Sequence, residues 1–132
     1  MEPIRFLSVQ EVIAINVAVI QKYSPSEQIG VKSLALLESA VLRPQSSAFG
    51  EDAYATLFDK AAALFESIGQ NHPFQNANKR TAFTALLVFL SYNHWEFNME
   101  PKQAEDLTVN MVNHKLTFEQ LVSRIKQYSI SK

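Results

Sequence analysis

The chain has 132 residues, a formal net charge of −1 and no cysteine. This length fits one domain, and the missing cysteines exclude a disulfide scaffold and a thiolate site. No excess of Lys and Arg indicates a nucleic acid or an anionic membrane as a partner, and only three glycines argue against a turn-rich β-sandwich.

The sequence shows neither a signal peptide nor a membrane-spanning segment. Residues 1–8 lack the charged start and apolar core of a signal peptide. The longest apolar-rich run, 82–90, is about half as long as a membrane span requires. We therefore expect a cytoplasmic protein.

Apolar residues recur at helical spacing in six segments. Two of these segments open with a capping-box pattern, Ser8 with Glu11 and Thr117 with Gln120. In chain order, the predicted helices span residues 9–23, 31–43, 52–68, 77–92, 101–113 and 117–128.

Polar and helix-breaking residues separate these helices. The stretch 45–50 is predicted to be a mobile loop, and 94–98 an extended connector. Gly69 is the expected C-terminal cap of the third helix, and Pro101 suits the first turn of the fifth. The fourth helix is apolar on nearly all sides and should lie at the centre.

No convincing strand pair, internal repeat or low-complexity segment interrupts this pattern. The sequence therefore predicts an all-α fold, a compact bundle of about six helices with a central apolar helix. We expect residues 1–132 to form a single domain.

A polar segment between two apolar helices, 70–81, carries the candidate chemistry. Lys79 and Arg80 fall in the first turn of a helix, where each opposes the helix dipole by a few tenths to about 1 kcal/mol. A bound phosphate would offset both charges and accept the free N–H groups of that turn. The imidazole of His72 could then act as a general base.

A plainer interpretation of this segment stays open. A His-Pro turn before a helix is often only a turn. Asn78 could be an ordinary helix cap, and Lys79 with Arg80 could be solvated surface.

The run HPFQNANKRTA at 72–82 resembles the signature of the Fic/Doc family. Fic proteins typically show HPFxxGNGR, whereas the Doc branch, the death-on-curing toxins, shows HxFxxANKRTA. Ala77 and Lys79 therefore match the Doc branch. The resemblance covers essentially the whole chain, including the Glu-Val-Ile-Ala-Ile run at 11–15 and Ala104–Thr108.

This resemblance implies a toxin that transfers a phosphate from ATP, or another nucleoside triphosphate, to a hydroxyl of a target protein. His72 would be the general base. Lys79, the second expected catalytic residue, accompanies phosphate transfer rather than AMP transfer in the Doc branch. The expected nucleotide-binding residues are Phe74, which also anchors the loop, and Asn76, Ala77, Asn78, Lys79 and Arg80.

Position 76 departs from the family pattern. Most active members carry Asp or Glu there, and this carboxylate holds Mg²⁺, whereas this chain has Asn76. An amide oxygen brings no charge, so we expect Mg²⁺ binding at Asn76 to be weak. Glu51 or Asp52 could lend a carboxylate to the ion.

The resemblance also implies partners. An antitoxin would cover the site with its C-terminal helix, and the target would be a translation factor such as elongation factor Tu. Residues 49–52 would correspond to the flap that aligns target peptides. Two alternatives stay open, namely a Fic-type nucleotidyltransferase that moves AMP and a catalytically weakened nucleotide-binding regulatory module, which Asn76 favours.

Four further residues have a structural interpretation beside a functional one. His94 and His114 lack the spacing of a metal site with His72, and we expect them at the surface or at helix caps. Trp95 and Phe97 could stack on a nucleotide base, but we expect this pair to close one end of the core.

Overall fold

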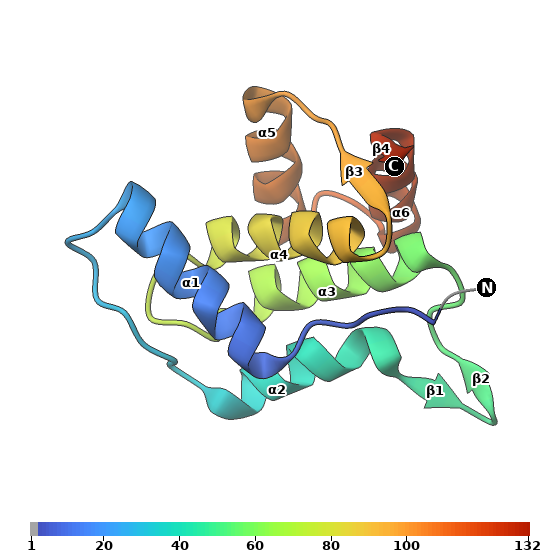
Figure 1. Ribbon diagram of the computed structural model, residues 1–132, viewed down its shortest axis with the longest axis horizontal. Coiled ribbons are helices and arrows are strands. Elements are labelled where there is room, and N and C mark those ends of the chain that lie inside the picture. The colour runs from blue at the N-terminus through green and yellow to red at the C-terminus, as the bar shows by residue number, and fades with distance from the viewer. Residues whose placement is uncertain (1–2) are drawn as a thin grey trace.

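The computed structural model describes residues 3–132, and six α-helices dominate this part of the chain (Figure 1). Four helix starts and most ends lie within two residues of the sequence prediction. The all-α prediction is thereby confirmed. The helices are α1 Val9–Tyr23, α2 Leu34–Leu42, α3 Leu57–Asn71, α4 Asn78–Tyr92, α5 Pro101–Val112 and α6 Phe118–Gln127.

Helices α3 and α4 lie side by side at the centre of the molecule (Figure 1). Helix α1 packs against α4, α2 packs against α3, and α5 and α6 cover the opposite side of the pair. The apolar helix α4 is central as predicted, but α3 buries more of its length, from Lys60 to Phe65 and again at Ser67–Gly69. A short loop, 72–77, joins the two central helices.

The interface between α3 and α5 explains Gly69, which the sequence analysis assigned to a helix cap. That assignment is wrong, because α3 continues through Gly69 to Asn71. A Cβ at this position would lie 2.4 Å from the terminal carbon of Met111 on α5. Gly69 therefore leaves the space that the Met111 and Val112 side chains of α5 occupy against α3.

The start of α3 also differs from the prediction. The helix begins at Leu57 rather than at residue 52, because Thr56 and Asp59 form a capping box that fixes its first turn. Tyr54, Leu57 and Phe58 are only partly buried, and the latter two pack against the rim of the core.

Two short antiparallel strand pairs were not predicted. Residues 45–50, expected to be a mobile loop, lie instead in the end of a 3₁₀ turn, Arg43–Gln45, and in a hairpin of β1 Ser47–Ala48 and β2 Glu51–Asp52. The two residues at its tip have positive φ, which is typical of a tight hairpin turn. Strands of two or three residues are too short to produce a readable alternation of polar and apolar residues.

The second pair joins β3 Trp95–Phe97 to β4 Ser129–Ser131. Trp95 packs edge-on against Phe58, with ring centroids 5.0 Å apart, and Phe97 packs against Phe83 at 6.0 Å. Trp95 and Phe97 therefore close one end of the core, as expected. His94 and His114 follow α4 and α5 with left-handed backbone, the conformation typical of helix C-terminal caps.

Among residues 3–132, no helix combines the length and the hydropathy needed to cross a lipid bilayer.

Candidate functional site

The loop between α3 and α4 is bounded by two residues with left-handed backbone. His72 caps the C-terminus of α3 with φ 48° and ψ 56°, and its side chain is exposed. Ala77 precedes the first turn of α4 with φ 62° and ψ 30°. Left-handed backbone is uncommon outside glycine, so surrounding contacts must hold the loop in this shape.

Asn78 and Phe74 hold the loop together from inside. The Phe74 ring is buried in the core with 1% exposure, the position expected of an anchor. The Asn78 side chain accepts a hydrogen bond from the Phe74 N–H and donates one to the Phe74 carbonyl, both at 3.0 Å. The interpretation of Asn78 as an ordinary helix cap is therefore wrong, because its side chain binds the loop and not the helix end.

The first turn of α4 is left with free donors. Within residues 3–132, no side chain caps this helix, and its first backbone hydrogen bond runs from the Thr81 N–H to the Ala77 carbonyl. The N–H groups of residues 78–80 therefore point away from the helix without a partner inside it. A left-handed residue followed by helical ones makes a concave nest of N–H groups that binds anions.

Lys79 and Arg80 bring two cations to this helix end. Within residues 3–132, neither has a carboxylate oxygen within 4.0 Å. The Arg80 guanidinium lies over the Tyr23 ring, 4.6 Å from its centroid, at the C-terminus of α1. The tyrosine face supports the guanidinium without neutralising it. The site is therefore open to an anion.

A segment of the chain that faces the loop, residues 24–33, was not recognised as part of the site. Its Lys32 and Ser33 N–H groups donate to the Pro73 carbonyl at 2.8 and 3.1 Å, and Gln75 donates to the Gly30 carbonyl at 3.0 Å. The Asn76 amide nitrogen donates to the Gln28 carbonyl at 3.0 Å. These bonds join the facing segment to the loop along most of its length.

Asn16 on α1 braces the same loop from the core side. It is buried, and its amide nitrogen donates to the Asn76 carbonyl and to the Thr81 hydroxyl, both at 3.0 Å. Sequence reasoning missed this residue. The available signal was an asparagine on the apolar face of a helix, since a buried amide needs a specific partner.

An open cleft of about 990 Å³ lies over the loop, which is large enough for a nucleotide. All the predicted site residues line it except the buried Phe74. Two carboxylates, Glu27 and Glu105, line it as well and were not predicted. The lining comprises Tyr23, Ser24, Glu27, His72, Gln75–Arg80, Phe83, Thr84, Pro101, Ala104, Glu105, Thr108 and Val109.

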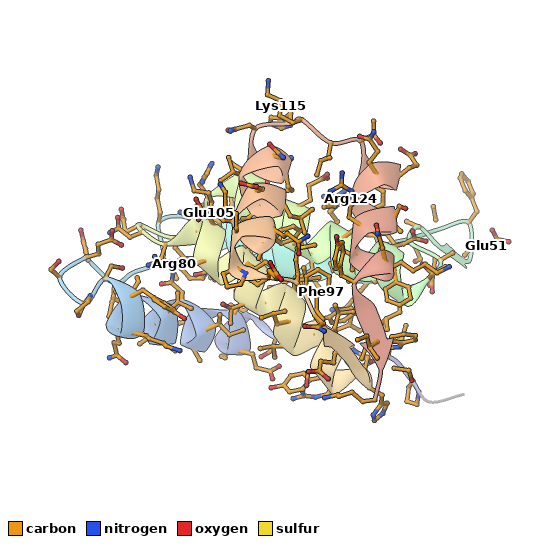
Figure 2. The ribbon with its side chains drawn as sticks, turned by 90° about the horizontal axis from the view of Figure 1, so that it is seen from above. Glu51, Arg80, Phe97, Glu105, Lys115 and Arg124 are labelled. Carbon is orange, nitrogen blue, oxygen red and sulfur yellow. The ribbon has the colours of Figure 1, made fainter. Side chains whose placement is uncertain are left out.

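The hairpin of β1 and β2 lies far from this cleft. Figure 2 shows Arg80 and Glu105 at one end of the molecule and Glu51 at the other. The hairpin adjoins the start of α3, whereas His72 follows its end, and 15 helical residues span about 22 Å. The prediction that residues 49–52 are a flap over the site is therefore wrong, and Glu51 or Asp52 cannot lend a carboxylate there. The facing segment, 24–33, occupies that place instead.

Histidines and carboxylates do not gather into a metal cluster. Over the described residues, 3–132, no group of three or more His, Asp or Glu side chains could hold a metal ion. His94 and His114 are absent from the cleft lining. Any cation in the cleft would therefore need oxygen ligands from a bound substrate.

The fold and the site define a class of helical proteins in which a helix start with free N–H groups and two cations lies beside an imidazole, an arrangement suited to a phosphate-bearing ligand. The comparison with known proteins identifies the class. The model of the Fic/DOC family matches residues 6–90 of the chain. The chain belongs to the Fic/DOC family.

Two curated relatives support this assignment. The chain is 34% identical to Toxin Doc of Mycolicibacterium smegmatis over 104 residues, which cover 77% of this chain and 80% of that protein. It is 28% identical to Protein kinase doc of Escherichia phage P1 over 123 residues, which cover 93% and 94% of the two chains.

Proposed function

We propose that this protein is a Doc-type toxin that transfers the γ-phosphate of a nucleoside triphosphate to a hydroxyl of a target protein. The observation that carries the proposal is the pair of unneutralised cations, Lys79 and Arg80, at an uncapped helix start in the cleft that holds His72. The names of the two relatives support the proposal, since one is called Toxin Doc and the other Protein kinase doc.

The chain's own groups would bind the phosphates in two ways. The N–H groups of residues 78–80 would donate hydrogen bonds to phosphate oxygens, which the positive end of the α4 dipole also attracts. Arg80 would hold a phosphate through its planar fork of donors, which matches phosphate geometry better than an ammonium group does. Tyr23 fixes the guanidinium in place for this contact.

His72 would act on the acceptor hydroxyl. Its imidazole would take the hydroxyl proton while the hydroxyl oxygen forms a bond to the γ-phosphorus. The bond from this phosphorus to the bridging oxygen then breaks, and the nucleoside diphosphate leaves with the electron pair. Positioned proton transfer of this kind contributes about 10²–10⁴-fold to a rate.

Lys79 favours one of the two reactions found in the family, transfer of the terminal phosphate rather than of AMP. In the Doc branch, a lysine in place of glycine accompanies transfer of the terminal phosphate, whereas Fic proteins with glycine transfer AMP. A flexible ammonium group in the first turn of α4 can neutralise charge on the transferred phosphate. We therefore assign Lys79 a catalytic role and ATP the role of donor.

Mg²⁺ bound with the nucleotide would supply further charge neutralisation at the phosphates. The Asn76 amide oxygen takes part in no hydrogen bond among residues 3–132, so it is available as a weak ligand. Mg²⁺ proteins commonly provide one or two carboxylates and leave the remaining positions to phosphates and water. The donor set of the cleft fits the ion if one of its two carboxylates takes part.

The proposal includes two protein partners. The open cleft leaves room for an antitoxin helix, whose apolar side chains could pack against Phe83, Pro101 and Ala104. The proposed target is a translation factor such as elongation factor Tu, which requires that the protein act in the cytoplasm. Binding of the antitoxin at this cleft would exclude both nucleotide and target.

A transfer assay tests the proposal. The purified protein is mixed with Mg²⁺, purified elongation factor Tu, bacterial lysate and ATP labelled separately at the α- and γ-phosphates. We expect label from the γ position alone, and loss of at least about 100-fold of the rate in His72→Ala. His114→Ala, which changes a histidine outside the cleft, is the matched control.

Each other outcome assigns a different function. Label from the α position would make the protein an AMP transferase and would contradict the role given to Lys79. No transfer from either position, with nucleotide binding intact, would favour a regulatory binding module.

A further inference from the structure

Asn76 has a structural role that an aspartate could not perform. Its amide nitrogen donates to the Gln28 carbonyl at 3.0 Å, and this bond joins the loop to the facing segment. A carboxylate at position 76 has no proton to donate and would repel the carbonyl oxygen. The residue that departs from the family pattern is therefore the one that fixes the facing segment at this point.

The bond to Gln28 also places the neighbouring residue, Glu27. Asn76 occupies the position where most family members carry their carboxylate, and its side chain holds the Gln28 carbonyl. Glu27 is the residue directly before Gln28 in the chain. Glu27 lines the same cleft as Asn76 and Arg80. The carboxylate missing from the motif is thus present on the segment that Asn76 holds.

The Glu27 carboxylate is itself partly fixed. One of its oxygens accepts a hydrogen bond from the Ser24 hydroxyl at 3.1 Å, and the Glu27 N–H donates to the Ser24 carbonyl at 2.9 Å. This turn follows directly on α1 and restricts the glutamate side chain. The second carboxylate oxygen has no hydrogen-bond partner among residues 3–132.

Glu27 also shares the cleft with two cations and forms no ion pair with either. Among residues 3–132, no nitrogen of Lys79 or Arg80 lies within 4.0 Å of a carboxylate oxygen. Two cations from α4 and a carboxylate from the facing segment therefore line one cleft without neutralising each other, which suits a ligand that carries both signs of charge. A nucleotide with its divalent cation is such a ligand.

We infer that Glu27 supplies the carboxylate ligand of the Mg²⁺ that accompanies the nucleotide phosphates, with Asn76 as the residue that positions it. This inference rests on the proposed function, since the ion enters with the nucleotide. The Glu27 carboxylate, the Asn76 amide oxygen and phosphate oxygens form a hard donor set that suits Mg²⁺.

The other carboxylate of the cleft, Glu105, is the alternative ligand. It lies on α5, whose hydrogen bonds do not reach the loop among the described residues, whereas Glu27 is joined to the loop through Gln28. Glu105 therefore provides a matched control, because it has the same side chain in the same cleft.

Binding of Mn²⁺, followed by electron paramagnetic resonance in the presence of a non-hydrolysable ATP analogue, tests the inference without requiring activity. We expect Glu27→Gln to weaken Mn²⁺ binding by about tenfold or more, and Glu105→Gln to change it by less than about twofold. The double variant Glu27→Gln with Asn76→Asp should regain most of the affinity, because a carboxylate returns to the site from the loop side.

Two results would overturn the inference, namely unchanged Mn²⁺ affinity in Glu27→Gln or a loss that occurs in Glu105→Gln instead. Binding of the same analogue without metal is measured in parallel by calorimetry, with Arg80→Ala as the negative control. If the wild-type protein binds no nucleotide, the proposed function fails together with the inference. If it binds nucleotide but its Mn²⁺ affinity ignores Glu27, only the inference fails.

Discussion

Two regions beside the central helix pair carry cations, but only the region on the side of the hairpin neutralises them. Beside the hairpin, Arg43 donates to Glu66 at 2.9 Å and to the Tyr54 hydroxyl at 2.7 Å. Lys60 is almost completely buried, and its ammonium group contacts Asp52 at 3.1 Å. Burial alone would lower the pKa of Arg43, but its hydrogen bonds to Tyr54 and Glu66 raise it above the ordinary value.

In the other region, Lys79 and Arg80 stand in the first turn of α4 with no carboxylate within 4.0 Å among residues 3–132. The helix dipole makes their position less favourable still. The difference teaches that a cation with a structural role has its partner within the fold, whereas the binding role proposed for Lys79 and Arg80 would leave that place to a ligand.

The largest effect is expected in the paired region. Arg43→Met should lower the free energy of unfolding by about 2–3 kcal/mol, because it leaves Glu66 charged and unpaired in a partly buried place. The value is below that of a fully buried pair because the Arg43 side chain is 30% exposed. Urea unfolding measures the change, and nucleotide affinity should stay as in the wild type.

The double variant Arg43→Met with Glu66→Met is the control for this effect. Replacing both charges by apolar side chains should restore much of the lost stability. Equal loss in the single and double variants would show that packing of the arginine stem, and not its pairing, stabilises this region.

Arg80→Ala should have the reverse pattern. We expect nucleotide affinity to fall by about 10–100-fold, the range of a lost charge-assisted hydrogen bond, while the free energy of unfolding hardly changes. Calorimetric titration with ATP and urea unfolding measure the two quantities. A large loss of stability together with unaltered affinity would break the comparison between the two regions.

Asn78→Ala tests whether the shape of the loop matters to the binding region. The substitution removes both hydrogen bonds to Phe74 and leaves its partly buried N–H without a partner, so unfolding should become easier by about 1–2 kcal/mol. Nucleotide affinity should fall as well, because the N–H nest loses its support. Asn71→Ala, at the end of α3, is the control, since its 3.4 Å bond to Leu36 is weaker and lies outside the loop.

Lys79→Gln should produce the smallest change in the free energy of unfolding, and the direction of that change is the informative result. Removing a cation from the start of a helix should raise the free energy of unfolding of the nucleotide-free protein by about 0.3–1 kcal/mol. Thermal unfolding with and without ATP would show a higher Tm without ligand and a smaller shift on ATP addition. A decrease of stability in the nucleotide-free protein would mean that Lys79 has a structural partner after all.

Local sequence signals predicted the helices well because their causes are local. Each capping box, at Ser8 and at Thr117, involves residues only three positions apart, and the apolar residues of a helix recur every three or four positions. Both signals can therefore be read directly from the chain. The helix that carries Lys79 and Arg80 was predicted for the same reason. The hairpin was missed because two-residue strands have no periodicity.

The rest of the site depends on contacts between distant parts of the chain. Asn16 reaches the loop across 60 residues, and the bond from Asn76 to Gln28 spans 48. No spacing rule connects such pairs, so Glu27 could not be assigned to the cleft before the fold was known. The resemblance to the family also placed the flap at residues 49–52, because a match along the sequence does not reveal where a surface loop lies in space.

The left-handed backbone at His72 and Ala77 has a consequence for how the loop moves. Each such residue stores about 1–2 kcal/mol that is released when the loop opens, whereas the helices on either side store none. The loop should therefore be a separate unit of low local stability, whose amide hydrogens exchange with solvent while those of α3 and α4 remain protected. Ligands could then enter and leave by local opening at either end of the loop, while the Phe74 ring stays anchored in the core.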